Sequence, residues 1–297
     1  MAPSPFRTLE SVLQVSPPSM LRMRGDFMAP SPFRTLESVL QVSPPPACSA
    51  CAGETKHEPG INMADLSQFP ITRRWKPTRP EVIQLYSLPT PNGVKASIML
   101  EETGLPYEVH LIDIMKDENK TAEFVSLNPN AKIPAMIDPG GPGGKPIGLF
   151  ESGAILVYLA DKSGKFMPTD PAKRYETLAW LFFQMASIGP MFGQVGFFHK
   201  FAGREYEDKR PLQRYVDESK RLLGVLESRL KDRDWLMDDY SIADIATLGW
   251  VRNLIGFYGA GELVDYARFK AVDAWLSRCL SRPAVQRGLQ IPARLAS

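Results

Sequence analysis

Residues in the middle of the 297-residue chain have the types and spacing to bind a small peptide. Lys132 and Ile133 precede Pro134, and a strand that begins at a proline leaves backbone N–H and C=O groups free to pair with an extended ligand. Glu151 and Ser152 open a predicted helix, where a carboxylate can bind an ammonium group. The hydroxyl and the free N–H groups of the helix end can bind a carboxylate. This pattern predicts a receptor for a zwitterionic peptide.

Thr90 and Asn92 lie in a proline-rich turn before a helix that we expect to stop at Gly104. The start of a helix carries about half a positive charge, so a hydroxyl, an amide and free N–H groups there favour a thiolate. Glutathione is a zwitterionic peptide that carries a thiol. No cysteine lies in this turn, so both thiols of a disulfide reduction would come from the peptide. Asparagine is also a good helix cap, and the two roles are compatible.

The elements that position these residues form an α/β layer, which we place at residues 81–164. Apolar patterns predict strands at 82–86, 107–113, 134–138 and 147–150, and helices near 94–103, 123–127 and 152–163. The order βαβαββα indicates a thioredoxin-like domain. The glycine-rich run at 139–144 lacks the Gly-Lys-Ser/Thr ending of a phosphate loop, and it predicts a hairpin turn.

Residues 171–290 predict an all-α domain, because apolar side chains recur at helical spacing and no strand pattern appears. Ser241 and Asp244 form a capping box at the start of a buried helix, with Tyr240 and Ile245 placed as a hydrophobic staple. Asp244 is therefore expected to be structural. The predicted fold class is α/β plus all-α.

Composition excludes several classes of function. A net charge of +2 gives no basis for nucleic-acid binding, and no apolar run is long enough to span a membrane. Three cysteines in this length argue against a disulfide scaffold and fit a reducing, cytoplasmic location. Cys279 is expected to be a small apolar core residue.

Residues 1–80 differ from the rest in composition. The segment 1–18 is repeated without a change at 28–45, and both copies are rich in proline and serine. We expect this extension to be disordered, with Met63 as a plausible start of translation; a targeting segment is the rival interpretation. Cys48 and Cys51 have redox-motif spacing but no flanking strand or helix, and no second pair completes a zinc site, so we expect no metal.

The motifs together resemble the cytosolic glutathione transferases over about residues 80–290. Those that carry the likeness are Thr-Pro-Asn-Gly at 90–93, Lys-Ile-Pro at 132–134, Phe-Glu-Ser-Gly-Ala-Ile at 150–155, Gly-Pro-Met-Phe-Gly-Gln at 189–194 and the capping box at 241–244. Three of these, at 90–93, 150–155 and 189–194, look like the bacterial nu class and a fungal branch that includes a nitrogen-catabolite regulator. The resemblance implies a homodimer that uses glutathione as co-substrate, without a tightly bound cofactor.

The resemblance also implies roles for the binding residues. Pro134 would follow a cis peptide bond, which leaves the Ile133 backbone to pair with the cysteinyl unit of glutathione. Lys132 would face the glycyl carboxylate, where a charge-assisted hydrogen bond is strong. Glu151 and Ser152 would hold the γ-glutamyl end.

The same resemblance makes Thr90 and Asn92 the catalytic residues, which would favour the thiolate. Arg214 would face a second glutathione. Tyr86 belongs to a buried strand and is expected to pack in the core. His199, near the end of the first long helix of the second domain, is expected to be a packed or surface residue.

These features predict a glutathione-dependent thiol–disulfide oxidoreductase that acts on small disulfides. One alternative is a glutathione S-transferase or peroxidase that acts on electrophiles. The other is a glutathione-binding regulatory protein, which the proline- and serine-rich extension makes less similar to the asparagine-rich fungal regulator.

Overall fold

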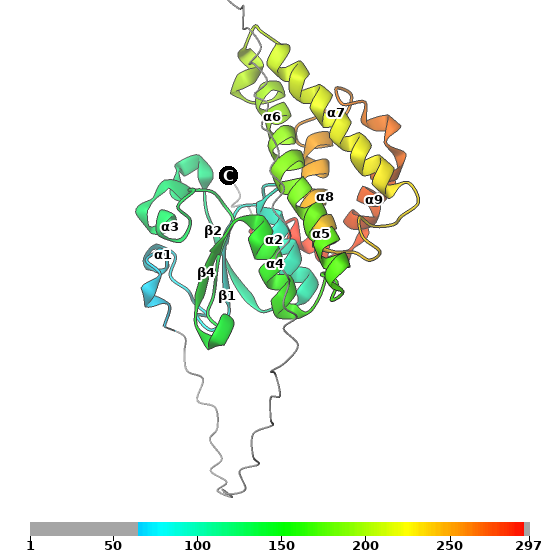
Figure 1. The fold of residues 1–297 in the computed structure, drawn as a ribbon. Helices are drawn as coiled ribbons and strands as arrows, with labels where there is room; N and C mark the ends of the chain where they lie inside the picture. Colours follow the sequence, from blue (N-terminus) through cyan, green and yellow to red (C-terminus); the bar gives the residue numbers. More distant parts are fainter. Residues whose placement is uncertain (1–64, 294–297) are drawn as a thin grey trace, which may run out of the picture. The chain divides into compact units, whose positions relative to one another are not determined.

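The computed structural model describes residues 65–293. Within them a half that contains a sheet is followed by a half built from helices alone (Figure 1). The described strands lie between Ile83 and Phe150, the last helix of the first half ends at Ser163, and the helical half begins at Pro171. The predicted fold class is confirmed.

The sheet of the described chain consists of β1 (Ile83–Ser87), β2 (Tyr107–Leu111), β3 (Ala135–Asp138) and β4 (Ile147–Phe150). Its order is β2-β1-β3-β4; β2 is parallel to β1, and the other two pairings are antiparallel. A parallel pair needs a crossover, which α2 (Gly93–Thr103) supplies. The glycine-rich run joins β3 to β4 as the predicted hairpin.

The register brings three sequence motifs to one end of the sheet. Ala135, which opens β3, pairs with Tyr86 near the end of β1 and with Phe150 at the end of β4. The turn after β1, the loop before β3 and the start of α4 (Ser152–Ser163) therefore emerge side by side. Antiparallel pairing on both sides of β3 is the reason that these separate segments can form one site.

Helices cover both faces of the sheet, as Figure 1 shows. Leu85 and Met136 point into the core that contains α2 and α4. Tyr86 and Ile137, one position along, point to the opposite face, which α3 (Ala122–Leu127) covers. Tyr86 is fully buried and stacks on His110, so its predicted core role is confirmed. Short 3₁₀ turns occupy Ile114–Lys116, Glu118–Lys120 and Pro142–Gly144.

The predicted disordered extension through residue 80 is wrong in its boundary. Leu66–Gln68 forms a 3₁₀ turn and Ile71–Arg74 forms the short helix α1. Leu66 and Ile71 are buried in the cluster under α3, which they complete together with Phe124. A pair of apolar residues in so short a segment gives no periodicity, so sequence reasoning missed it. The duplicated segment and the Cys48–Cys51 pair lie outside the described residues.

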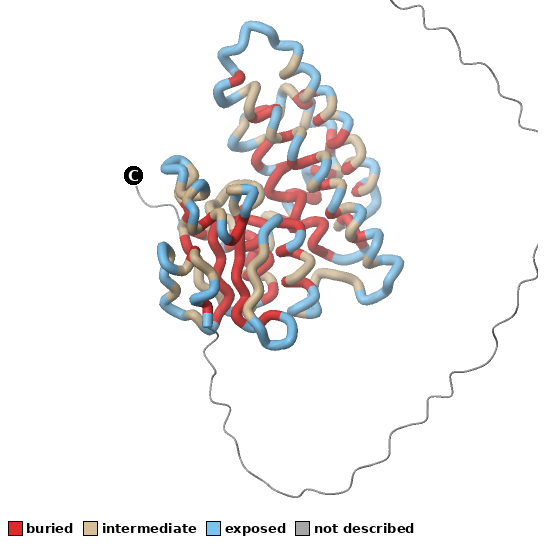
Figure 2. The backbone as a smooth tube through the Cα atoms, turned by 60° about the vertical axis from the view of Figure 1, so that its left-hand side comes forward, coloured by how far each residue is buried: buried red, intermediate tan, exposed pale blue. Residues whose placement is uncertain are grey.

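The helical half packs around one buried helix, α8 (Ile242–Ile255). The other helices in the described part of this half are α5 (Pro171–Phe183), the π-helical turn η5 (Gln184–Ile188), α6 (Gly189–His199), α7 (Arg210–Leu230), α9 (Lys270–Ser281) and α10 (Pro283–Gly288), with 3₁₀ turns at Ala202–Glu205 and Tyr266–Arg268. Figure 2 shows the buried backbone continuing from the sheet into this half. None of the described helices is both long and apolar enough to cross a membrane.

Asp244 holds the start of α8 in place. Its buried carboxylate accepts hydrogen bonds from the backbone N–H groups of Leu236 and Ser241, both at 2.9 Å, and from the Trp275 indole at 2.8 Å. Ser241 completes the predicted capping box. A buried carboxylate needs such donors, and with them Asp244 is structural, as predicted.

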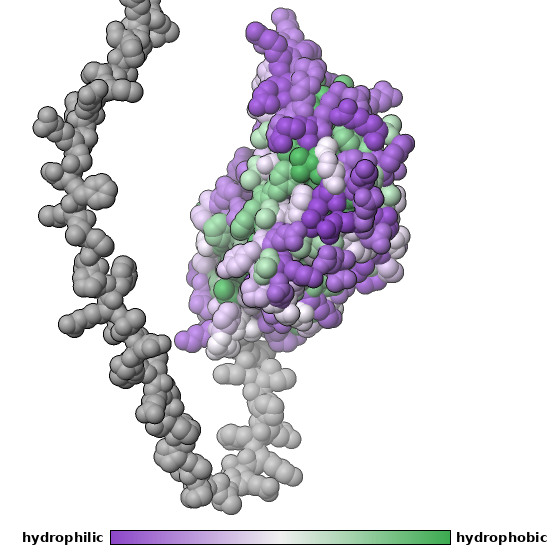
Figure 3. Space-filling model, turned by 45° about the vertical axis from the view of Figure 1, so that its right-hand side comes forward, coloured by the Kyte–Doolittle hydropathy of each residue, from purple (hydrophilic) through white to green (hydrophobic). Residues whose placement is uncertain are grey.

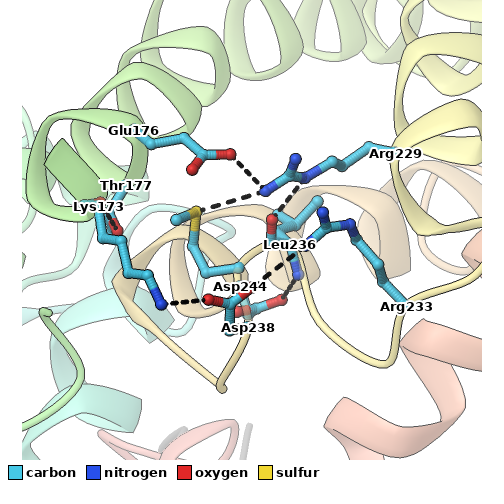
Figure 4. Close-up of polar contacts among 9 residues, drawn as sticks. Lys173, Glu176, Thr177, Arg229, Arg233, Leu236, Asp238 and Asp244 are labelled. Carbon is cyan, nitrogen blue, oxygen red and sulfur yellow. Dashed lines mark hydrogen bonds and ion pairs between the residues drawn. The ribbon is translucent and has the colours of Figure 1, made fainter.

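An ion pair connects the loop before α8 to α5, and a hydrogen bond from Arg229 connects it to α7 (Figure 4). Lys173 contacts Asp238 at 2.7 Å, and Arg229 contacts Glu176 at 2.7 Å while donating to the Leu236 carbonyl. The Lys173–Asp238 pair is exposed, so solvent screens it and it contributes little to stability. The hydrogen bonds of Asp244 are buried and are not screened in this way.

The two halves share one apolar core, in which α2 lies between α4, α8 and α10. Ser97 on α2 donates to the Gly288 carbonyl at 2.7 Å, and Arg282 pairs with Glu102 at 2.6 Å. A Cβ on Gly288 would lie 2.6 Å from the Ile98 backbone, so this close approach requires glycine. The relative position of the halves is thus fixed by packing against α2.

The turn into α2 generates the first prediction. A Cβ on Gly93 would overlap the Leu88 carbonyl oxygen, a backbone atom that cannot rotate away. Gly93→Ala should therefore lower the free energy of unfolding in denaturant by about 1–3 kcal/mol or more. The matched control is Gly224→Ala in α7, where a Cβ meets nothing within 4 Å and alanine favours the helix. Equal effects of the two substitutions would contradict the packing argument.

Candidate functional site

A cavity of about 500 Å³ opens at the end of the sheet where the three motifs meet, and the helical half forms its other wall. Most of the residues predicted for the site line it: Asn92, Lys132, Ile133, Pro134, Glu151 and Ser152. The helical half adds residues of η5, α6 and α8, among them Gln194 of the motif at 189–194. The cavity therefore draws on both halves of the chain.

Two of the predicted site residues do not line the cavity. Thr90 is one of them, and its hydroxyl accepts a hydrogen bond from the Gly93 N–H at 3.2 Å. Arg214 is exposed on α7. Thr90 thus shapes the start of α2, and the structure does not bring Arg214 to the other site residues. His199 is half-buried at the end of α6, outside the lining.

Two asparagine side chains fix the conformation of the loop before β3 by hydrogen bonds to its backbone carbonyls. The Asn128 side chain donates to the Lys132 carbonyl, and Asn119 donates to the Ala131 carbonyl at 2.6 Å. The Ile133–Pro134 bond is cis, as predicted. Neither the N–H nor the C=O of Ile133 makes a backbone hydrogen bond to another described residue. A ligand backbone can pair with these groups.

Glu151 and Ser152 stand at the start of α4 in different environments. Ser152 is buried, whereas Glu151 is exposed and has a φ of 69°. A residue with a side chain costs about 1–3 kcal/mol in such a conformation. This unfavourable conformation occurs at the cavity, where it places the Glu151 carboxylate next to the free N–H groups at the start of α4.

The Asn92 side chain is oriented by a residue of the helical half. The Trp250 indole N–H donates to Asn92 Oδ1 at 2.9 Å. Because an indole nitrogen is only a donor, the amide oxygen must face Trp250. The two Nδ2–H groups remain available to the cavity. Asn92 makes no side-chain cap bond to α2, so its expected capping role is wrong; Trp250 occupies the oxygen that would accept the bond.

Lys95 is the principal site residue that sequence reasoning missed. It is fully buried on α2, and its Nζ contacts Gln184 Oε1 at 2.5 Å, Ser152 Oγ at 3.3 Å and Met185 Sδ at 3.3 Å. Burial lowers the pKa of Lys95 to about 7, and the nearby Glu151 carboxylate opposes that shift. The available signal was a lysine in the mainly apolar first part of α2, which is buried from Gly93 to Leu100.

Gln184 lies at the π-helical turn between α5 and α6, and its side chain is fully buried. Its Nε2 group has no partner among the described residues. A Cβ on Gly189 would lie 3.0 Å from that nitrogen, so glycine there leaves space for the amide. π-helical turns are frequent at functional sites, and this one places an unpaired donor on the cavity wall.

Within residues 65–293, neither a reactive thiol nor a metal-binding cluster is available for catalysis. Cys279 is buried in α9, and burial raises the pKa of its thiol well above the usual value, as expected for a core residue. Among the described residues no cluster of histidine, cysteine and acidic side chains could hold a metal ion. The cavity itself offers hydrogen-bond donors, one carboxylate and two amines.

Two family models match the chain. The glutathione S-transferase N-terminal domain matches residues 81–161, and the glutathione S-transferase C-terminal domain matches residues 178–283. The chain belongs to the glutathione S-transferase family. The resemblance inferred from the motifs is confirmed.

Relatives in this family are similar over most of their length. Disulfide-bond oxidoreductase YghU of Escherichia coli is 41% identical over 228 residues, which are 74% of this chain and 78% of that protein. A glutathione transferase of Burkholderia graminis, solved with two glutathione molecules per subunit, is 66% identical, with a TM-score of 0.77 over 78% of this chain and 98% of its own. One from Pseudomonas putida, solved with one glutathione disulfide per subunit, is 63% identical, with a TM-score of 0.76 over 77% of this chain and 99% of its own.

Lys95 makes the stability of this family member depend on pH. Between the folded-state pKa near 7 and the unfolded-state pKa near 10.5, the unfolded chain binds more protons, so stability rises with pH. The free energy of unfolding of the wild type, relative to Lys95→Met, should increase by about 2 kcal/mol from pH 7 to pH 9 and stay level below pH 6. Denaturant titrations across this range measure it. A difference that does not change with pH would show that Lys95 titrates normally.

Proposed function

We propose that the protein is a glutathione-dependent thiol–disulfide oxidoreductase that reduces small disulfides. The observation that carries this proposal is the cavity itself, which combines a peptide-binding loop, a free amide donor at the start of α2 and no cysteine in its lining. The disulfide-bond oxidoreductase among its relatives supports it, as do the relatives solved with glutathione and with glutathione disulfide.

Glutathione would lie along the loop before β3. Glu151 binds its ammonium group, and Ser152 with the N–H groups of α4 binds the adjacent carboxylate. The free backbone groups of Ile133 pair with the cysteinyl unit. Lys132, which is exposed on the rim, faces the glycyl carboxylate. This placement directs the sulfur toward Asn92 and the start of α2.

The reaction needs a thiolate and two glutathione molecules. The Asn92 Nδ2–H groups and the helix end stabilise the first thiolate, which attacks one sulfur of the disulfide. A mixed disulfide forms, and the other sulfur leaves as a thiolate that takes up a proton. A second glutathione thiolate then attacks the glutathione sulfur of the mixed disulfide. Glutathione disulfide forms and the second substrate thiol is released, so two electrons pass from glutathione to the substrate.

We further propose a cytoplasmic homodimer with an all-α domain at 171–290 and a first domain that ends at 164 and includes the ordered segment from Leu66 to Arg74. Tyr175 and Phe182 are exposed seven residues apart on α5, and Phe150 is exposed at the end of the edge strand β4. Figure 3 shows a band of hydrophobic surface between hydrophilic regions on one face. Exposed aromatic side chains and an edge strand are features of an interface between copies. The end of α4 at Ser163, the start of α5 at Pro171 and the end of α10 at Gly288 support these domain limits.

Turnover without a protein thiol tests the function. The full chain and a variant carrying Cys48→Ser, Cys51→Ser and Cys279→Ala should reduce a small model disulfide equally well, with glutathione reductase and NADPH reporting the glutathione disulfide formed. If the wild type is inactive but binds glutathione, a conjugating enzyme or a regulatory protein is favoured instead. Activity that disappears in the folded variant would assign the reaction to a cysteine of the chain.

Asn92→Ala should lower kcat for disulfide reduction about 10- to 100-fold, because it removes donors to the developing thiolate. Its dissociation constant for glutathione should change much less. Trp250→Phe keeps the aromatic packing but removes the indole N–H that orients Asn92, so it should also lower kcat more than affinity. Equal losses of kcat and affinity in both variants would contradict the role of Asn92 at sulfur.

Glu151→Gln should weaken glutathione binding about tenfold, since the ligand ammonium loses its charge partner. A glutathione analogue with a glutaryl group in place of γ-glutamyl lacks that ammonium, and its affinity should not fall in the variant. Glu81→Gln, at an exposed position outside the cavity lining, is the matched control and should leave both affinities unchanged. Calorimetry measures all of these affinities. An unchanged affinity of Glu151→Gln for glutathione would remove this residue from the site.

A further inference from the structure

Lys95 is a buried amine whose function the peptide-binding motifs do not explain. Its Nζ lies on the wall of the cavity, within hydrogen-bond distance of Ser152, which opens α4, and of Gln184 in η5. Burying an amine without a full counter-charge is costly, and replacing such a group by an apolar one is often stabilising. A lysine at this place therefore indicates an anion that binds next to it.

The described chain offers Lys95 one carboxylate, that of Glu151. The other groups that contact it are uncharged: Ser152 of α4 and Gln184 and Met185 of η5. Trp250, which α8 adds to the cavity lining, is also uncharged. The second amine on the cavity, Lys132, adds positive charge, and on α10, which packs against α2, Arg287 pairs with Glu101. Once Glu151 pairs with a ligand ammonium, the residues of the described range 65–293 offer Lys95 no second carboxylate.

The hydrogen bonds around Lys95 are arranged to receive a carboxylate. An ammonium only donates, so Ser152 Oγ accepts from Lys95, and the Ser152 hydroxyl proton is free to point elsewhere. Its present acceptor is the Met185 sulfur at 3.8 Å, a weak partner that a carboxylate oxygen can replace. The buried Gln184 Nε2 group has no partner and is a second free donor. Three donors thus converge on one part of the cavity.

We propose that Lys95 is the buried counter-charge for the α-carboxylate of the γ-glutamyl group and that it takes up a proton when this carboxylate binds. Ser152 and Gln184 donate to the same carboxylate, while Glu151 holds the neighbouring ammonium. This inference rests on the proposed binding of glutathione. It adds Lys95 and Gln184 to the carboxylate position already proposed at Ser152, and it links ligand binding to pH.

The sign of the linkage follows from the two states. In the free protein burial lowers the pKa of Lys95 to about 7, and a carboxylate beside the amine raises it. Above pH 7, binding therefore takes up a proton, and affinity falls as pH rises, by at most about tenfold per pH unit. Below pH 6 the amine is charged in both states, and affinity is independent of Lys95 titration.

Calorimetry on the wild-type chain tests the proposal. The probe is S-methylglutathione, which has no thiol to titrate, and its comparison is the same peptide with 4-aminobutyryl in place of γ-glutamyl, which lacks only the α-carboxylate. At pH 7.5, in two buffers of different ionisation heat, the first ligand should take up a substantial fraction of a proton and the second close to none. Binding of the first without proton uptake, or equal uptake by both, overturns the proposal.

Lys95→Met supplies the second arm. The wild type should prefer the carboxylate-bearing ligand by about tenfold or more, and the variant should lose most of that preference together with the proton uptake. Lys132→Met is the matched control, because it removes an amine near the other carboxylate and should weaken both ligands alike. If Lys95→Met does not fold, the wild-type comparison still decides. Binding of neither ligand would overturn both this inference and the proposed function, whereas binding with proton uptake but no disulfide reduction would overturn the function alone.

Discussion

Helix α8 packs against the turn at the start of α2, and the geometry of the cavity depends on this contact. A Cβ on Gly249 would lie 3.1 Å from the Pro91 carbonyl oxygen, so the absence of a side chain at Gly249 lets the two backbones approach closely. The next residue, Trp250, hydrogen-bonds to Asn92. Asp244 at the other end of α8 fixes the helix through a set of buried hydrogen bonds. The capping box at the start of α8 therefore helps to position Trp250, which in turn orients the Asn92 amide at the cavity wall.

Charge is distributed unevenly around the cavity, and the proposed selectivity of the site rests on this distribution. Glu151 and Lys132 are exposed, so water screens their charges and their interaction with a ligand is weakened. Lys95 is buried, where electrostatic interactions are stronger and an unpaired charge is expensive. An exposed carboxylate beside a buried amine matches a ligand end that carries an ammonium and a carboxylate on one carbon. The same arrangement explains why the fold tolerates the unfavourable conformation of Glu151.

Sequence reasoning recovered what local signals encode. The strands, the hairpin, the glycine stop of α2 and the capping box each depend on residues close together in the chain, and proline or glycine marks their ends. It missed the partners that come from afar: Lys95 meets Gln184 across 89 positions, and Trp250 meets Asn92 across 158. No periodicity records such pairs. The expected capping role of Asn92 failed for the same reason, since a tryptophan of the other half donates to its side-chain oxygen, and Thr90 accepts the hydrogen bond from the Gly93 N–H instead.

The central claim is that this cavity stabilises the thiolate of bound glutathione without a cysteine of its own. The most direct measurement is a pH titration of the ultraviolet absorbance of the thiolate, with glutathione bound to the cysteine-free variant and with glutathione free in solution. A thiol pKa that is lower in the bound peptide than in free solution is the predicted result. A bound thiol that titrates at the same pH as the free one would contradict the claim, even if glutathione binds tightly.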